Sequence, residues 1–337
     1  MVDAIVAEGL SKTFNGSVKA VDGVSFSVRE GEIYGFLGPN GAGKTTTLSL
    51  LTAVLGPTAG QATVDGLDVF RHPHDLKQRI GLVFQESTAD QDLTGRENLE
   101  LAAALFGVPL RDTPKRVDYL LSRLALSEAS ERLVKTYSGG MRRRLELAVG
   151  IVHSPRVLFL DEPTLGLDPQ GRAGFWKIIQ ELRQESGMTV FLTTHYLDEA
   201  DGMCDRIAII DHGKIVATGT PSELKDRLGG DVVTVRPLGN AAALEPALKA
   251  LPGVTAVTAQ DGTFRVKCPG GDVLIPKIVG AATALGIPIA GISLRRPSLD
   301  EVFLEFTGRE YREDEGPTAT DRAVFLTRFQ QSRRGIR

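Results

Sequence analysis

The sequence predicts an α/β protein with two domains: a larger one built on a mostly parallel, helix-covered sheet, and a smaller α+β one. Short apolar strands alternate with amphipathic helices over roughly the first 218 residues, a pattern typical of parallel strands joined by helical crossovers. Gly229-Gly230 then interrupts the chain, and a shorter series of strands and helices follows. The length of 337 residues supports this division, because single cores stop growing near roughly 250–300 residues.

Composition and charge are those of a soluble globular protein. Charged residues make up 24% and hydrophobic residues 42% of the chain, and the formal net charge of -3 predicts no nucleic-acid partner. No apolar run reaches the roughly 18–20 residues of a membrane-spanning helix, and we expect no secretion signal at the N-terminus. Cys204 and Cys268 lack metal-binding spacing, so we expect reduced, partly buried thiols in a cytosolic compartment. Any membrane role is therefore expected to be peripheral.

The first domain opens with short strands and a glycine-rich loop. The strands are expected at Ile5–Ala7, Val24–Val28 and Ile33–Leu37. The third strand runs directly into the loop, and a helix over Thr45–Val54 follows, because leucines recur there at helical spacing before Gly56-Pro57. Strand, glycine loop and helix form the context that a phosphate-binding loop requires.

This loop predicts a bound nucleoside triphosphate. Its glycines let backbone amides turn inward, and the helix that follows adds its positive end to the cradle. Lys44 is expected to reach the outer phosphates, and the Thr45 hydroxyl is expected to bind Mg²⁺. The predicted cradle consists of Gly38, Pro39, Asn40, Gly41, Ala42, Gly43, Lys44 and Thr45.

Residues from about 93 to 153 are predicted to form a helical subdomain. Thr94-Gly95-Arg96-Glu97 is a capping-box pattern, Thr113-Pro114 is typical of a second helix start, and Ser138 can cap a third helix. This third helix opens on Tyr137-Ser138-Gly139-Gly140-Met141. Its Ser-Gly-Gly element offers a second set of amides for the same phosphates, and we do not expect one molecule to use both sets at once.

A buried strand that ends in two carboxylates predicts the other half of the site. Four apolar residues, Val157–Leu160, precede Asp161 and Glu162. Asp161 is expected to hold Mg²⁺ through water, because hard cations prefer oxygen ligands. Glu162 is then free to orient or polarise the attacking water, an assistance worth roughly 10²–10⁴ in rate. The alternative is a surface acidic pair that only closes a strand.

Further alternation completes the first domain. The expected elements are a helix around Phe175–Glu185, a strand at Val190–Thr194, and a hairpin-like pair at Ile207–Ile210 and Ile215–Thr218. Thr220-Pro221-Ser222-Glu223 starts another capped helix, and Gly229-Gly230 marks the predicted domain end. We therefore assign residues 1–229 to a nucleotide-binding domain.

The second domain, residues 230–307, is predicted to be ferredoxin-like, because its elements follow the order βαββαβ. The expected strands are Val232–Arg236, Val254–Ala259, Thr263–Cys268 and Ile287–Leu294, and the expected helices are Ala241–Leu251, Val273–Leu285 and Leu299–Phe306. Residues 308–337 are predicted to be a flexible charged tail. The alternative is one amphipathic turn over Val324–Phe329 that contacts a membrane or a partner helix.

With these motifs in order, the chain resembles the ATPase subunits of ABC transporters, which share the P-loop NTPase fold. The resemblance covers roughly residues 5 to 218. Tyr137–Met141 matches the family signature usually written LSGGQ, whose serine and glycine amides meet the terminal phosphate bound by the opposite protomer. Ser138, Gly139 and Gly140 are intact, whereas Tyr replaces Leu and Met replaces Gln, which leaves open what Met141 contacts. The resemblance implies a homodimer that sandwiches ATP and Mg²⁺.

The resemblance also implies roles for residues that would be unremarkable alone. Phe14 lies where the family's aromatic residue, more often Tyr, stacks on adenine; by itself it would be an ordinary core phenylalanine. Gln85 matches the glutamine that senses Mg²⁺ and the attacking water, and Thr46 joins the predicted nucleotide contacts. These roles come from the family alone.

Two more positions near the site are interpreted in the same way, and a run of three arginines is interpreted from its charge. Asp168 matches a loop that crosses the dimer interface, near the partner's phosphate loop, and His195 matches the switch histidine that contacts the terminal phosphate and holds Glu162 in place. A lone histidine at a strand end would otherwise be structural. Arg142–Arg144 is interpreted either as an anion patch or as a solvated helix face.

Within the family, the chain resembles the ATPases of daunorubicin/doxorubicin-resistance exporters. Three segments carry this resemblance: Thr94–Leu99, Tyr137–Arg144 and Pro297–Leu304. It implies a separate integral-membrane permease, a peripheral location on the cytoplasmic face of the cell membrane, and export as the direction. One alternative is a soluble ABC-type switch without a permease, which the single ATPase unit and the lack of heptads disfavour. Another is a ligand-sensing module over residues 232–306, for which the composition offers no ligand constellation.

Overall fold

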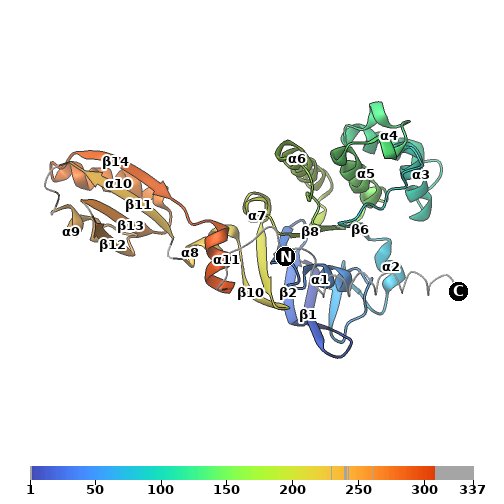
Figure 1. Ribbon diagram of the computed structural model, residues 1–337, viewed down its shortest axis with the longest axis horizontal. Coiled ribbons are helices and arrows are strands. Elements are labelled where there is room, and N and C mark those ends of the chain that lie inside the picture. The colour runs from blue at the N-terminus through green and yellow to red at the C-terminus, as the bar shows by residue number, and fades with distance from the viewer. Residues whose placement is uncertain (1, 229, 239–240, 242, 261, 308–337) are drawn as a thin grey trace. The chain divides into compact units, whose positions relative to one another are not determined.

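The chain divides into two compact units, residues 2–218 and 219–307. The computed structural model describes residues 2–228, 230–238, 241, 243–260 and 262–307 (Figure 1). The division falls after Thr218, rather than after Gly229 as predicted, because α8 (Pro221–Asp226) packs against α11 (Leu299–Thr307), the last helix of the second unit. The predicted tail and the alternative turn over 324–329 lie outside the described residues.

A six-stranded sheet of order β10-β9-β3-β8-β7-β6 forms the centre of the first unit. Neighbouring strands from β9 to β6 run parallel, which confirms the predicted sheet. Its strands are β3 (Ile33–Leu37), β6 (Ile80–Val83), β7 (Val157–Asp161), β8 (Thr189–Thr194), β9 (Arg206–Asp211) and β10 (Lys214–Gly219). Every residue of β3, β7 and β8 is buried, as expected for parallel strands that are covered on both faces.

A second, antiparallel sheet of order β2-β1-β4-β5 belongs to the same unit. Its strands are β1 (Asp3–Phe14), β2 (Val18–Arg29), β4 (Ala59–Val64) and β5 (Leu67–Asp68). The predicted strands near residues 5 and 24 were too short. Gly9 and the polar run Ser11–Thr13 interrupt the apolar alternation, but register shifts on both sides of Leu10 let β1 continue to pair with β2.

Aromatic side chains join the two sheets. Phe26 of β2 stacks on Tyr34 of β3 and on Phe191 of β8, with ring centroids 5.6 and 5.9 Å apart. Phe36 and Phe159 extend the same cluster, each 5.6 Å from Phe191. Because these rings come from four strands, their burial fixes the antiparallel sheet over the central one.

The helices of the first unit include a separate helical subdomain, as predicted. Its elements are α3 (Gly95–Leu105), α4 (Thr113–Arg123) and α5 (Gly139–Ile151), with short 3₁₀ turns at Ser127–Ala129 and Val134–Thr136 (Figure 1). The other helices are α1 (Lys44–Leu51), α2 (Pro73–Lys77), α6 (Pro169–Ser186) and α7 (Leu197–Met203). Thr94 forms the predicted capping box with Glu97, and the Ser138 hydroxyl caps α5.

Tyr137 links the starts of α3 and α5. Its ring is 3% exposed, and its hydroxyl donates to the Ala129 carbonyl at 2.6 Å. A Cβ atom at Gly95 would lie 2.2 Å from the Tyr137 Oη atom, so only glycine fits at this position of α3. Thr94–Leu99 and Tyr137–Arg144, two of the segments that carry the exporter resemblance, therefore pack against each other.

The second unit has the predicted ferredoxin-like topology. Its antiparallel sheet has the order β12-β13-β11-β14. The strands are β11 (Asp231–Pro237), β12 (Ala256–Gln260), β13 (Thr263–Cys268) and β14 (Ile289–Arg295), and the helices besides α8 and α11 are α9 (Leu244–Lys249) and α10 (Gly271–Ala284). Val233, Val235 and Val266 of the central strands are fully buried against Leu248 and Ile278 of the helices.

Two expectations from composition can also be compared with the described residues. Cys204 and Cys268 are free and buried, and burial raises the pKa of both thiols. Among the described helices, none is both long and apolar enough to cross a membrane.

Replacing Gly95 tests the Tyr137 packing. Gly95→Ala should destabilise the protein by about 1–3 kcal/mol, because the new methyl group must displace a hydroxyl that is held by Ala129. Adding Tyr137→Phe should recover part of the loss. Urea denaturation of the purified chain measures both effects.

Gly174→Ala is the matched control, because Gly174 lies within α6 and a Cβ atom there meets nothing within 4 Å. This change should be neutral or stabilising by up to about 1 kcal/mol. A Gly95→Ala variant as stable as the parent chain would contradict the packing.

Candidate active site

The glycine loop, the Asp161-Glu162 pair and His195 lie at the carboxyl ends of three adjacent strands, β3, β7 and β8. Leu37 at the end of β3 pairs with Thr194 of β8, and Asp161 at the end of β7 pairs with Thr193. The segments that leave these strands therefore begin at one edge of the sheet. Ligands of open parallel sheets bind at this edge.

The glycine loop after β3 is closely packed from outside. A Cβ atom at Gly38 would lie 2.3 Å from the Ile210 carbonyl oxygen, and one at Gly43 would lie 2.4 Å from that of Ala20. Gly43 also has a φ of 109°, which only glycine adopts readily. The loop therefore holds its turn by close backbone contacts before it enters α1.

Lys44, the first residue of α1, is a buried cation at this loop. Its side chain is 4% exposed, and its Nζ atom lies 3.4 Å from the Glu162 Oε1 atom. Nζ also donates to the carbonyls of Gly38 at 2.8 Å and Pro39 at 3.2 Å. The ammonium charge is thus balanced inside the protein and stays next to the loop, where a phosphate could replace the carbonyl partners.

The structure brings two of the three predicted metal residues together. Asp161 is fully buried, and its Oδ1 atom accepts hydrogen bonds from the Thr45 hydroxyl at 3.0 Å and the Thr193 hydroxyl at 2.7 Å. Gln85 follows β6 and is exposed, and in the described part of the chain it makes no hydrogen bond to Asp161 or Thr45. A hydroxyl and a carboxylate side by side are the oxygen ligands that Mg²⁺ prefers.

Glu162 has an unusual backbone and a carboxylate between two cationic or potentially cationic groups. Its φ is 47°, a left-handed conformation that costs a non-glycine residue roughly 1–3 kcal/mol. The Glu162 amide donates to both the carbonyl and the hydroxyl of Thr193, at 3.1 Å each. Its Oε2 atom lies 3.0 Å from the His195 Nδ1 atom, while Oε1 faces Lys44.

These neighbours keep the Glu162 carboxylate charged. The residue is 8% exposed, and burial alone would raise the pKa of its carboxyl. His195 and Lys44 outweigh this effect, so the pKa lies below its ordinary value. Glu162 is therefore ionised at neutral pH and able to accept a proton or to orient a water molecule.

His195 lies between the Tyr196 ring and the Glu162 carboxylate. It follows β8, is 8% exposed, and its ring lies 4.2 Å from that of Tyr196. The Arg172 guanidinium lies over the Tyr196 ring, 3.7 Å from its centroid. The His195 Nδ1 atom is the one that faces Glu162, so the structure brings together the two residues that were predicted to pair.

The second set of predicted phosphate contacts faces open space. Ser138 and Gly139 are exposed, and Cβ atoms at Gly139 or Gly140 would meet nothing within 4 Å. The Ser138 hydroxyl accepts from the Met141 amide at 3.2 Å, and among the described residues no hydrogen bond joins Ser138–Gly140 to the glycine loop. Within one chain, these amides and the loop are therefore not joined into one cradle.

Three other predicted contacts have a structural explanation of their own. Phe14 is 7% exposed and belongs to the hydrophobic core, which favours the alternative of an ordinary core phenylalanine. Asp168 is exposed and caps α6, accepting from the Gly171 amide at 3.1 Å. Thr46 is buried in α1. Their roles toward a nucleotide stay predictions.

The sequence interpretation missed two residues that shape the site. Thr193 bonds both Asp161 and Glu162, but a threonine inside an apolar strand carries no functional signal. Arg143 is 7% exposed, so the interpretation of Arg142–Arg144 as a solvated face is wrong for this residue. Its spacing from Leu147 and Gly150 along the buried face of α5 was the available signal.

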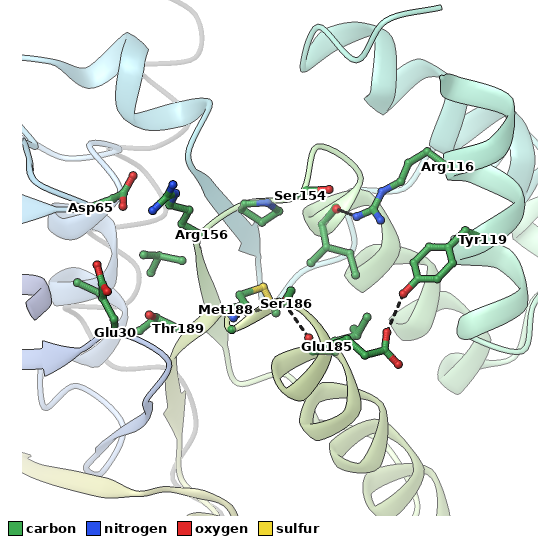
Figure 2. A pocket seen from close by; sticks show the side chains of 16 residues that line it. Glu30, Asp65, Arg116, Tyr119, Ser154, Arg156, Glu185, Ser186, Met188 and Thr189 are labelled. Carbon is green, nitrogen blue, oxygen red and sulfur yellow. Dashed lines mark hydrogen bonds between the residues drawn. The ribbon is translucent and has the colours of Figure 1, made fainter. Parts of the chain in front are cut away.

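A cavity of about 570 Å³ lies elsewhere in the first unit (Figure 2). Its lining includes Val157 and Thr189, the first residues of β7 and β8, together with Arg116 and Tyr119 of α4. It is therefore at the amino ends of the strands, away from the glycine loop and Glu162. Tyr119 donates to Glu185 across this cavity at 2.8 Å.

Fold and geometry together define a class of protein, the phosphate-loop nucleotide hydrolases. The family model described as ABC transporter matches residues 21–165, and the model described as ATP-binding protein DrrA1-3-like, C-terminal domain, matches residues 219–307. The Daunorubicin resistance ATP-binding protein DrrA3 of Streptomyces coeruleorubidus is 44% identical over 92% of this chain and 97% of its own. The chain therefore belongs to the family of ABC transporter ATP-binding proteins, and it is an ABC-type ATPase.

Two further comparisons extend this result. The Nod factor export ATP-binding protein I of Ralstonia nicotianae is 40% identical over 91% of this chain and 94% of its own. The ATP-binding cassette MJ0796, solved as a dimer in a post-hydrolysis state with ADP and Pi, aligns with a TM-score of 0.59 at 25% identity over 64% of this chain and 98% of that one. The fold of the first unit is thus that of known ATP-binding cassettes.

A buried carboxylate beside the site gives a pH prediction. Glu199 of α7 is 8% exposed and accepts from the Thr164 hydroxyl at 2.7 Å, and burial raises the pKa of its carboxyl despite that bond. A raised pKa in the folded chain means that the contribution of Glu199 to stability is full below its ordinary pKa and is lost as the pH rises through the folded value. Glu199→Gln should therefore raise the melting temperature at pH 8, and the gain should shrink toward pH 4.

Thermal unfolding of parent and variant across this pH range measures the difference. Glu128→Gln, which changes an exposed carboxylate in the 3₁₀ turn, serves as the control and should shift the melting temperature little at any pH. A Glu199→Gln gain that grows as the pH falls would contradict the assigned sign.

Proposed function

We propose that two copies of this chain sandwich two Mg·ATP molecules and hydrolyse them to power export through a separate membrane permease. The observation that carries the proposal is the Glu162 carboxylate, held 3.4 Å from the Lys44 Nζ atom and 3.0 Å from the His195 Nδ1 atom at the end of β7. A base, a phosphate-binding cation and an orienting imidazole thus meet at the mouth of the glycine loop.

Each side chain then has a task in hydrolysis. The amides of Gly38–Thr46 hold the phosphates, and Lys44 exchanges its carbonyl partners for phosphate oxygens. Glu162 takes a proton from, or orients, the attacking water, while His195 keeps the carboxylate in place and contacts the terminal phosphate.

Thr45 and Asp161 would hold Mg²⁺. Their oxygens are 3.0 Å apart, and among the described residues no cluster of three His, Cys, Asp or Glu side chains offers an alternative metal site. The ion would neutralise charge on the phosphates. Gln85, exposed after β6, would complete this set toward the terminal phosphate.

The dimer is supported by the separation, within one chain, of the Ser138–Gly140 element from the glycine loop. Ser138, Gly139 and Gly140 present unobstructed backbone at the start of α5 but are not bonded to the glycine loop of their own chain. In a two-fold arrangement each copy would supply this element, and the exposed Asp168, to the other's nucleotide. A related cassette is known as a dimer with ADP and Pi.

The permease and the membrane location are supported by the family. A protein that belongs to the ABC transporter ATP-binding proteins requires a membrane partner for transport, and no described helix can supply it. We propose a peripheral position at the cytoplasmic face of the cell membrane. The names of the relatives, which refer to daunorubicin resistance and to Nod factor export, support export of a drug-like or lipid-like compound.

Mixing two inactive variants tests the composite site. Lys44→Ala disables the glycine loop and Gly139→Asp disables the opposite element, so each variant alone should lose ATPase activity by roughly 10²-fold or more. Refolded or co-expressed mixtures should regain about a quarter of the parent activity, because half of randomly formed dimers are mixed and each of those has one intact site.

The matched control mixes Lys44→Ala with Glu162→Gln. Both changes lie on the same side of a nucleotide, so every mixed dimer has two damaged sites and should stay inactive. Lack of recovery in the first mixture, or equal recovery in both, would contradict the sandwich.

Purification from membranes tests the transport assignment. Full-length tagged chain, isolated from detergent-solubilised membranes of its native host, should retain an integral-membrane protein with many spans, and deletion of the chain should raise cellular accumulation of daunorubicin. Mass spectrometry and fluorescence measure the two effects. Copurification with ribosomes or soluble proteins alone would instead favour the soluble switch.

A further inference from the structure

Arg143 of α5 is a buried cation whose every donor group is occupied. Its Nη1 atom donates to the Phe84 carbonyl at 2.6 Å and to Glu146 Oε2 at 2.8 Å, and its Nη2 atom donates to the carbonyls of Asp161 and Glu162 at 3.2 Å each. Its Nε atom donates to the Pro163 carbonyl. A guanidinium has five N–H donors, and all five are accounted for.

The acceptors belong to separate segments of the fold. Phe84 directly precedes Gln85 after β6, and Asp161–Pro163 is the segment that leaves β7. Arg143 itself lies little more than one turn from Ser138, on the helix that Ser138 caps. One planar group thus joins the helix of the exposed Ser138–Gly140 element to two strand ends that carry predicted catalytic residues.

Arginine suits this position for physical reasons. The guanidinium is always charged and presents its donors in a rigid plane, whereas a lysine offers three donors on one flexible atom. Glu146, which is 6% exposed, balances the buried charge. The adjacent Arg144 differs, because its side chain donates to Gly140 and Leu124, both within the helical subdomain.

The contact with Glu162 bears on chemistry. Glu162 has its left-handed backbone held from two sides: Thr193 binds its amide, and Arg143 binds its carbonyl. These bonds hold the peptide groups before and after Glu162. They therefore also fix the position of its Cα atom and the direction in which its side chain leaves the backbone. A shift of α5 must stretch the Arg143 bonds or carry this backbone with it.

We propose that Arg143 is a positioning residue for ATP hydrolysis, which sets the Glu162 backbone in register with the helix that offers Ser138–Gly140 to the second copy. The inference rests on the proposed function, because it takes Glu162 as the group that activates water. Engagement of α5 by a partner's nucleotide would then be transmitted to Glu162 through one guanidinium.

Arg143→Lys tests this role in the full-length chain. It should lower kcat for ATP hydrolysis by roughly 10- to 10²-fold, because small displacements of a reacting group have effects of this size. The KM for ATP and the dissociation constant of a fluorescent ATP analogue should stay within about twofold, because the five hydrogen bonds of Arg143 go to residues outside the Gly38–Thr46 loop.

Arg116→Lys is the matched control. Arg116 is a partly buried arginine of α4 that donates to the carbonyls of Ile151 at 2.7 Å and Val152 at 2.9 Å, beside the cavity at the other end of the sheet (Figure 2). Its replacement should lower the melting temperature as Arg143→Lys does, but it should leave kcat within about twofold of the parent.

Two more variants keep the outcomes distinct. Glu146→Gln leaves Arg143 in place without its counter-ion and should lower kcat in the same direction but less, so it replaces Arg143→Lys if that variant does not fold. Glu162→Gln should abolish hydrolysis while ATP binding persists. Full hydrolysis by Glu162→Gln would overturn the proposed base; loss there with unchanged kcat in both Arg143→Lys and Glu146→Gln would overturn the positioning role alone.

Discussion

The backbone conformation immediately after β7 is the constraint on which the site depends. Glu162 adopts a φ of 47°, which turns its carboxylate toward Lys44 and His195 instead of continuing the strand. This conformation is unfavourable for a residue with a side chain, so other bonds must hold it. Thr193 on β8 and Arg143 on α5 supply them. The parallel pairing of β7 with β8 is what places Thr193 within reach.

Charge balance follows from the same arrangement. Lys44, Glu162 and Asp161 are all buried, and isolated charges in such surroundings would be costly. They occur together, with hydroxyls and carbonyls completing their hydrogen bonds, so the site is polar without being open. Arg143 and Glu146 form another buried ion pair, in which each side chain balances the charge of the other. The first unit thus has a buried ionic cluster of Lys44, Glu162 and Asp161 at the glycine loop, and a buried ion pair on α5 of the helical subdomain.

One departure from the common family signature, Tyr137, has a structural reason. Tyr137 replaces the usual leucine, and its hydroxyl reaches the Ala129 carbonyl through the space that the absent side chain of Gly95 leaves. A tyrosine and a glycine more than forty positions apart in the chain are therefore coupled by size. In the second unit, Leu299, Val302 and Phe303 of the Pro297–Leu304 segment are buried. They belong to α11, which packs against α8 of the same unit.

The sequence by itself determined the features that depend on neighbours along the chain. The glycine loop between strand and helix, the capping boxes at Thr94 and Thr220, and the βαββαβ order could all be predicted, because turns, caps and apolar periodicity are local. The pairing of Glu162 with His195 was predicted only through the family resemblance. Only the tertiary structure decided the features that depend on distant contacts. It continued β1 past Gly9 by pairing it with β2, placed Phe14 in the core, and buried Arg143 beneath the ends of β6 and β7. The sequence around Arg143 suggests a solvated side chain, because its neighbours are also arginines. The carbonyl groups that bind it come from distant segments, and only the fold brings them together.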